Sequence, residues 1–459
     1  MTPLPNLAQR YRERRGRGRA SALSATAQLL RAPAGQAFGL MTMRSMTIAV
    51  KFALTLFITR YLGLAELGLY GIITSIAALG PVLLGFGVAN NLGREAARHG
   101  AASIALPVLQ YFLFLVPAYA GLCVIGMAVW PDRAGWLCLL AVLLFLDHLQ
   151  TEMFSLMTLT GSAYEANVAY FIRFALWSIV YIPLALFEPG LRNLTTVLAF
   201  WLAGCVVATA LTLVFTRHWR WGSAARRLRT SKLQLPHQSG SMALYVADSV
   251  NASFVYLDRY IVGLFLNVQA IGIYVLYWSI TNALNNIITI SVVQIKRGEL
   301  VKVAHVGGDS LHRALVSVCF SSGALALAMG AMATVMMYFV VPHLGRPEVV
   351  AYLPLMFILC AGLLLRTIYE VIGISFYAYG RDDLTLYSVV GVLVVALVLN
   401  LWLDPTVGIW GAGLALAVSY AAGVIGRLAV IVRGFQRRAP PSALDVAEED
   451  AADEAIAAG

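Results

Sequence analysis

Charged residues are scarce in this sequence of 459 residues: Asp, Glu, Lys and Arg together make up 12%, whereas hydrophobic residues make up 60%. The mean hydropathy is +0.77. A soluble domain of this length cannot bury so much apolar surface, so the composition excludes a soluble globular protein. The solvent for most of the chain is therefore lipid, and the function has to be performed within or across a membrane.

Cysteines and catalytic motifs are also few. The five cysteines all fall in apolar segments and none forms a Cys-x-x-Cys pair, which argues against a disulfide framework or a zinc site. The sequence contains no G-x-x-x-x-G-K-[ST] loop for nucleotide phosphates, and no H-E-x-x-H or G-x-S-x-G motif for proteolysis. We therefore expect no cofactor, no metal centre and no enzymatic activity.

Apolar segments of about 20 residues, the length of helix that crosses a bilayer core, fill most of the chain. Helices are expected because backbone polar groups in lipid must be satisfied within the segment. The predicted spans are 38–60, 66–90, 104–130, 136–158, 167–187, 194–216, 241–265, 270–294, 313–341, 352–379, 384–403 and 408–432.

Lys and Arg are concentrated in the segments that face the cytoplasm if both termini are cytoplasmic. The loops on the other side carry only Arg133, Arg192 and Arg346. We therefore predict a multi-pass membrane protein with both termini inside. The net charge of +10 then reflects topology and anionic lipid, and we expect no nucleic-acid partner.

The longest internal hydrophilic segment, residues 217–240, divides the chain into two halves of six spans. The predicted organisation is a basic cytoplasmic arm, a first six-helix lobe, a basic cytoplasmic linker, a second six-helix lobe and an acidic disordered tail. Their predicted ranges are 1–37, 38–216, 217–240, 241–433 and 434–459.

An internal repeat supports this division. Gly68 and Tyr70 match Gly272 and Tyr274 at an offset of 204, and Ser75-Ile76 match Ser279-Ile280 at the same offset. An even number of spans separates the copies, so they point the same way, and parallel repeats imply a pseudo-twofold axis along the membrane normal. The predicted fold class is an all-α polytopic membrane protein with about twelve transmembrane helices in two pseudo-symmetric six-helix lobes around a central cavity.

Basic residues inside the spans are the candidates for binding an anionic ligand, because such residues usually face a cavity. Arg44 and Lys51 lie two turns apart on one helix face and suit a pyrophosphate group. Lys51 and Arg366 are the leading candidates, and Arg44 and Arg259 come next. Two other interpretations remain open: Arg44 could reach lipid headgroups, and Arg366 could form a salt bridge with Glu370 four residues on.

Acidic residues inside the spans are the candidates for binding a coupling ion, either a proton or Na⁺. They are Asp147, Asp248, Asp258 and Glu370. An ion pair is the alternative role for these acids, and Arg173 in the fifth span is a candidate partner for one of the two acids of the fourth span, Asp147 or Glu152.

Polar residues of the eighth span complete the candidate site. Trp278, Asn282 and Asn285 recur at helical spacing, so they could contact sugar hydroxyls or form hydrogen bonds between helices.

Three stretches resemble bacterial O-antigen and polysaccharide flippases of the multidrug/oligosaccharidyl-lipid/polysaccharide exporter superfamily. They are FALTLFITRYLGLAELGLYGIITSIAALGPVLLGFGVANNLGREAARHG (52–100), YLDRYIVGLFLNVQAIGIY (256–274) and VGIWGAGLALAVSYAAG (407–423). The resemblance implies two lobes that alternate between inward-open and outward-open states. It also implies a polyprenyl-pyrophosphate-linked oligosaccharide as cargo, an ion gradient as the driving force, and association with a polysaccharide polymerase and other assembly proteins.

The near balance of intramembrane acids and bases departs from the strongly cationic cavity that this cargo requires. A multidrug or cation antiporter of the same superfamily is therefore kept as an alternative, which an acidic or apolar cavity would favour. A membrane glycan polymerase or ligase and a non-transporting scaffold are further alternatives.

Overall fold

The computed structural model describes residues 33–231, 242–293, 309–379 and 381–433, together with residues 295, 296, 298, 300 and 303. Most of the predicted arm 1–37, the linker from residue 232 to 240 and the whole predicted tail 434–459 lie outside these residues. The predicted domain boundaries stay predictions.

Every regular element in these ranges is a helix. The first half of the chain forms α2 (Pro33–Phe57), α3 (Leu64–Leu84), α4 (Val88–His99), α5 (Ala105–Val129), α6 (Ala134–Leu159), α7 (Ala163–Phe171), α8 (Trp177–Phe187) and α9 (Leu194–Phe215). The second half forms α10 (Trp221–Leu228), α11 (Met242–Phe265), α12 (Val268–Ile288), α14 (Asp309–Val340), α15 (Pro347–Val350), α16 (Leu355–Ala378), α17 (Asp382–Val407) and α18 (Ile409–Val432).

Short turns of other helix types extend or join these helices. Three π-helical turns are η1 (Ile58–Leu62) after α2, η3 (Ile172–Leu176) between α7 and α8, and η6 (Thr289–Val293) after α12. Four 3₁₀ turns are η2 (Pro131–Arg133), η4 (Pro189–Leu191), η5 (Arg217–Trp219) and η7 (Val341–Leu344).

The described part of the chain contains 10 helical segments that are long and apolar enough to cross a membrane. The helices α11 and α12 have similar lengths but are more polar: α11 carries Asp248, Asp258 and Arg259, and α12 carries three asparagines. Together they make the twelve spans predicted from the sequence. The prediction of an all-α membrane protein with about twelve transmembrane helices is confirmed.

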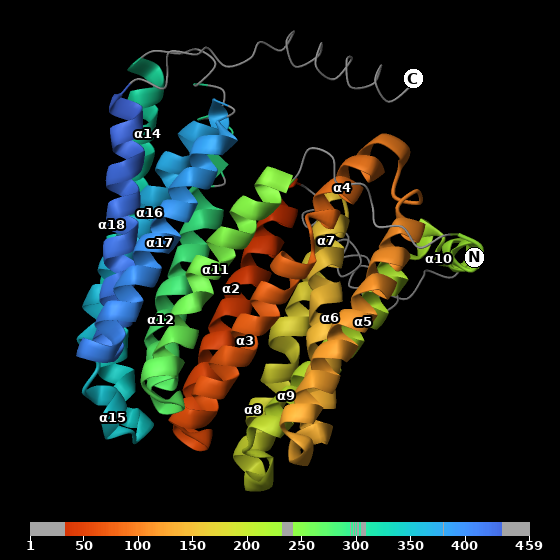
Figure 1. Ribbon diagram of the computed structural model, residues 1–459, viewed down its shortest axis with the longest axis horizontal. Helices are drawn as coiled ribbons and strands as arrows, with labels where there is room; N and C mark the ends of the chain where they lie inside the picture. Colours follow the sequence, from red (N-terminus) through yellow and green to blue (C-terminus); the bar gives the residue numbers. More distant parts are fainter. Residues whose placement is uncertain are drawn as a thin grey trace, which may run out of the picture.

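The two halves of the chain form two lobes (Figure 1). The first lobe, α2 to α9, runs from red to olive in the figure, and the second lobe, α11 to α18, runs from green to blue. Helices α2 and α3 lie beside α11 and α12 at the centre, where the lobes meet. We call the face at which α2 begins and α18 ends the terminal side, and the opposite face the far side.

The second predicted span, 66–90, is shorter in the structure than in the prediction. Helix α3 ends at Leu84, and the chain turns at Phe86 (φ 49°) and Gly87 (φ 68°) before α4 begins. Helix α4 buries Val88, Leu92 and Ala96 at a spacing of four residues, so it is amphipathic and lies against α6. Hydropathy alone did not reveal this turn, because the start of α4 is itself apolar.

The two lobes come into backbone contact near the far side, where α3 crosses α12. A Cβ atom on Gly68 would lie 2.0 Å from the carbonyl oxygen of Val268, and a Cβ atom on Gly272 would lie 2.0 Å from that of Leu64. Residues 64 and 268 differ by the same 204 positions as the two glycines, so the contact is reciprocal about the pseudo-twofold axis. We call these four residues the far-side seam. Only glycine permits so close an approach, which explains why the repeat retains it in both copies.

Candidate functional site

A cavity of about 440 Å³ lies between the two lobes, next to the far-side seam. Helices α2, α3, α6, α7, α8, α9, α11 and α12 line it, as does the π-helical turn η3 between α7 and α8. π-Helical turns often occur at functional sites, because the extra residue redirects side chains. Here η3 places Arg173 and Phe174 in the cavity wall.

The cavity is separated from the far side by packed helix ends. Tyr70, Trp201, Arg259 and Val275 are the lining residues nearest that side, and each lies six or seven residues from the far end of its helix. At 1.5 Å per residue, about 10 Å of helix covers the cavity there. The guanidinium of Arg346, in the loop after η7, adds a contact between the lobes by donating to the carbonyl oxygen of Thr59 at 3.3 Å. Toward the terminal side the lining continues to Asn286, close to the end of α12.

Two cations that line the cavity are not held in an ion pair within the described part of the chain. The ammonium of Lys51 lies 3.7 Å from the centre of the Phe174 ring. The guanidinium of Arg259 lies 3.9 Å from the centre of the Trp278 ring and donates to the hydroxyl of Ser75. Neither cation forms a salt bridge in the described part of the chain, so both are available to an anion in the cavity.

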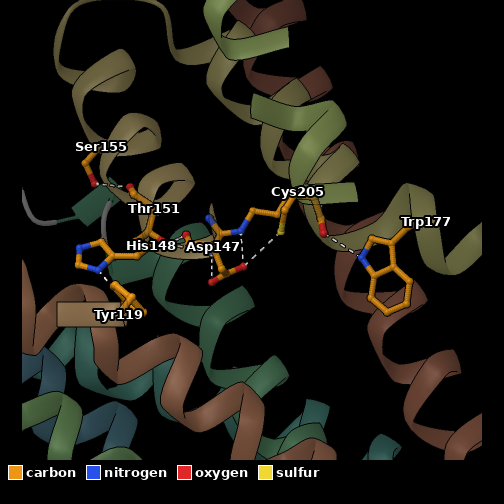
Figure 2. Close-up of polar contacts among 8 residues, drawn as sticks. Tyr119, Asp147, His148, Thr151, Ser155, Trp177 and Cys205 are labelled. Carbon is orange, nitrogen blue, oxygen red and sulfur yellow. Dashed lines mark hydrogen bonds and ion pairs between the residues drawn. The ribbon is translucent and has the colours of Figure 1, made fainter. Parts of the chain in front are cut away.

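A third cation, Arg173, is neutralised by Asp147. Its Nε and Nη2 donate to the two carboxylate oxygens at 2.7 and 2.5 Å, and both side chains are buried. This bidentate ion pair is the alternative role expected for Asp147. Figure 2 shows the surroundings of Asp147: Cys205 approaches one side of the carboxylate, and His148, the next residue along α6, points the opposite way toward Tyr119. Asp147 therefore adds no uncompensated negative charge to the cavity.

Aromatic side chains form most of the remaining wall. Trp177 and Trp201 lie parallel, with ring centres 6.5 Å apart, and Tyr70 and Tyr256 also face the space. Trp278 and Asn282 reach the cavity from α12, as their helical spacing predicts. Flat aromatic faces beside amides and hydroxyls can contact the apolar faces and hydroxyl groups of a sugar.

Arg44 lies close to the cavity but does not line it. It donates to the side-chain oxygen of Asn167 at 2.8 Å and stacks over Phe154 and Tyr170, which do line the cavity.

Arg366 and Glu370 form a polar network behind α12. Arg366 donates to Glu370 at 2.9 Å, which is the salt bridge that their spacing allows, and to Asn282 at 3.0 Å. Asn285 donates to Glu370 at 3.2 Å and faces α16, away from the cavity lining. Arg366 thus contacts the cavity only through Asn282.

A second polar site lies within the second lobe, between α11 and α17. Asp258 is 4% exposed and accepts hydrogen bonds from Tyr274 at 2.5 Å and from its neighbouring backbone N–H at 2.8 Å. Asp404 is fully buried, and neither of its carboxylate oxygens has a hydrogen-bond partner among the described residues. The side-chain oxygen of Asn400 is also unpartnered, and it shares a small void with Asp258. Buried oxygens of this kind suit a cation.

Asp248 lies apart from both sites. It is exposed near the terminal end of α11 and does not line the central cavity.

Asn400 and Asp404 did not emerge from the sequence analysis. The predicted span 384–403 ends one residue before Asp404, so this residue was not considered as an intramembrane acid. In the structure α17 continues through Pro405 to Val407, which keeps Asp404 buried. The sequence did contain a sign of this site: Asn400 and Asp404 are spaced i, i+4 and therefore lie on one face of a long apolar helix.

Comparisons with known proteins bear on the fold. No protein-family model matches the sequence, and no curated protein sequence matches it. A structure of lipid II flippase MurJ in an inward closed conformation superposes with a TM-score of 0.60 at 13% identity, over 85% of this chain and 87% of that chain.

Multidrug resistance transporters of the MATE family and MOP superfamily superpose similarly. An inward-facing conformation gives a TM-score of 0.59 at 14% identity, over 85% of this chain and 95% of that chain. An outward-facing conformation gives a TM-score of 0.52 at 14% identity, over 86% of this chain and 93% of that chain. The chain therefore has the fold shared by MATE transporters and MurJ.

Proposed function

We propose that this protein is a flippase that moves a polyprenyl-pyrophosphate-linked oligosaccharide from the cytoplasmic to the outer leaflet of the bacterial inner membrane, for surface polysaccharide synthesis. The terminal side is the cytoplasmic side in this proposal. The central cavity receives the pyrophosphate and the first sugars, while the polyprenyl chain stays in the bilayer.

The observation that carries this proposal is the charge of the cavity. Lys51 and Arg259 face it without a salt bridge in the described residues, and Arg173 neutralises Asp147. The cavity wall therefore carries an excess of positive charge that favours a phosphate-bearing ligand, because charge-assisted hydrogen bonds to phosphate are among the strongest in proteins. The balance of acids and bases in the sequence concealed this excess, since the other intramembrane acids lie outside the cavity lining.

A multidrug antiporter is the second candidate, because aromatic walls also suit cationic drugs and several structures with this fold are described as multidrug transporters. The cation–π contacts weigh against it. The ring of Phe174 already faces Lys51, and that of Trp278 already faces Arg259. A cationic ligand would have to displace these cations or lie beside them, and like charges repel.

We propose the buried site of Asp258, Asn400 and Asp404 as the place where the coupling ion binds. Asp258 and Asn400 line one small void, and the unpartnered carboxylate of Asp404 lies one helical turn beyond Asn400 on α17, in a region where an uncompensated carboxylate is costly. Binding Na⁺ or a proton there would remove that cost, so the packing of α11 against α17 depends on the ion. Asp248 and Glu370 are weaker candidates, because one is exposed and the other is paired with Arg366.

Delivery of the lipid-linked oligosaccharide in cells is the test of this function. In a strain that lacks this protein and any second flippase, the lipid-linked unit should accumulate on the cytoplasmic face, and the wild-type gene should relieve the accumulation. Unchanged surface glycan in that strain would contradict the flippase proposal, and a drug-efflux screen with the same strain would then test the antiporter.

A further inference from the structure

A buried cluster of titratable side chains in the first lobe takes no part in the proposed transport site. His148 lies on α6, fully buried, on the opposite face from Asp147 (Figure 2). Its Nε2 lies 2.8 Å from the hydroxyl of Tyr111 and its Nδ1 lies 2.9 Å from the hydroxyl of Tyr119. Glu152, one helical turn further along α6, places a carboxylate oxygen 3.7 Å from Nε2.

We propose that His148 and Glu152 together bind one proton. This proton stabilises the packing of the terminal-side end of α3 against the rest of the first lobe. Glu152 is 8% exposed, and His148 is the only basic side chain paired with it in the described part of the chain. An ionised Glu152 beside a neutral imidazole would leave a negative charge without compensation in the lobe interior. One proton taken from water, held on the imidazole or on the carboxyl group, makes the pair neutral overall.

The hydrogen-bond partners of His148 can accommodate the proton in either place. The hydroxyl of Tyr111 also approaches the carbonyl oxygen of Leu84 as a donor, at 3.4 Å, so it can accept from Nε2–H. The hydroxyl of Tyr119 can donate to an unprotonated Nδ1 and can accept from a protonated one. Loss or gain of the proton on the ring therefore requires only that one hydroxyl rotate.

The cluster surrounds the terminal end of α3, the helix whose other end forms the far-side seam. A Cβ atom on Gly80 would lie 3.0 Å from the hydroxyl of Tyr119, and one on Gly85 would lie 2.8 Å from the carboxylate of Glu152. Movement of this end of α3 would admit water to Glu152. The carboxylate would then be stable without its proton, so proton release and movement of α3 are linked.

Other charged and titratable groups face the cluster. They are Tyr111 and Tyr119 on α5, Asp147 on α6 with its partner Arg173 on η3, and Tyr245 on α11. The ion pair fixes the charges of Asp147 and Arg173, and the tyrosines stay neutral in the physiological range. His148 and Glu152 are therefore the groups of the cluster that can hold the additional proton.

Spectroscopy on the full-length protein in lipid nanodiscs tests the occupancy directly. The chain has 7 histidines, and the ¹⁵N signals of His148 are those that disappear in His148→Gln. A protonated carboxyl group is seen by its infrared C=O band, and the band of Glu152 is the one lost in Glu152→Gln. At pH 7 we expect either a cationic His148 or a protonated Glu152. A neutral His148 together with an ionised Glu152 would overturn the proposal.

Hydrogen exchange of the backbone amides of residues 80–92 tests the link to α3. After correction for intrinsic exchange, we expect exchange in the wild type to quicken by up to about tenfold per pH unit in the range where the proton is lost. In Glu152→Gln the side chain keeps its size without a charge, so this pH dependence should disappear. Persistence of the full pH dependence in Glu152→Gln would refute the link. If Glu152 had only a structural role, the substitution would change the exchange rate by the same factor at every pH. Neither measurement depends on the transported substrate.

Discussion

At the residue scale, the sequence shows which intramembrane residues are charged and where they lie on their helices. It does not show which of these charges form ion pairs. Four of the candidate residues, Lys51, Arg259, Trp278 and Asn282, line the cavity. Arg366 does not, because its guanidinium is held by Glu370 on its own helix and by Asn282 on α12. Whether an intramembrane charge is paired depends on which helices are neighbours, and a single sequence does not record that.

We expect Lys51→Ala to reduce export of the lipid-linked oligosaccharide by about tenfold or more, because a charge-assisted hydrogen bond to the pyrophosphate contributes roughly 1.5–3 kcal/mol. Lys51→Arg keeps the charge and should retain a larger share of export. The measurement is surface glycan per cell at equal amounts of protein in the membrane. Arg133→Ala, on the exposed turn η2, is the control. Normal export in Lys51→Ala would remove Lys51 from the binding site.

Asp404→Asn should weaken binding of the coupling ion by about tenfold or more, because it removes one charge from the buried oxygen site while keeping its shape. The dependence of transport on Na⁺ concentration and on pH, measured in proteoliposomes, identifies which ion is affected. Asp383→Asn is a matched control on the same helix, since Asp383 is exposed and pairs with Arg381. An unchanged ion dependence in Asp404→Asn would exclude this site from coupling.

At the element scale, the sequence predicts the spans well and the interruptions poorly. Most span boundaries agree to within a few residues, because about 20 apolar residues in lipid have little alternative to a helix. The turn at Phe86 and the continuation of α17 through Pro405 were missed, since both are decided by tertiary packing. The π-helical turn η3, which places Arg173 against Asp147, leaves no mark in the hydropathy pattern.

The far-side seam gives a prediction for a single element. Gly68→Ala should separate α3 from α12, because the new methyl group would lie 2.0 Å from a backbone oxygen that cannot move alone. A cysteine at Tyr70, in a background without other cysteines, should then react several-fold faster with a membrane-impermeant thiol reagent added outside. Gly391→Ala is the control, since nothing lies within 4 Å of its Cβ position. Equal reaction rates in Gly68→Ala and its parent would contradict the role of the seam.

At the scale of the whole molecule, the repeat found in the sequence indicates the architecture before any contact is known. The match at an offset of 204 residues predicted two parallel lobes, and the structure adds that the matched glycines meet each other's helices. The cavity between the lobes was predicted, but its seal toward the far side was not. That seal depends on close backbone contacts. A glycine in the sequence permits such a contact but does not indicate which helix will make it.

Joining the lobes covalently across the seam should stop transport. A bifunctional thiol reagent that links cysteines introduced at Leu64 and Val268 would hold α3 against α12, so export should fall to background while the ligand still binds from the terminal side. The natural pair Cys123 and Cys138, whose sulfur atoms lie 3.8 Å apart within the first lobe, provides a control link. Transport that continues after complete cross-linking at the seam would show that the lobes do not separate there.

The reciprocal seam also bears on the origin of the chain. A contact in which residue 64 meets residue 272 while residue 268 meets residue 68 has the pattern of an isologous interface, the kind formed by two identical subunits around a twofold axis. A half-length ancestor with glycine at this position could have formed the same seam as a homodimer. Duplication and fusion would then free each half to diverge. Both halves contribute a cation to the cavity wall, Lys51 and Arg259, and the second half also holds the buried oxygen site, while the glycine is present in both.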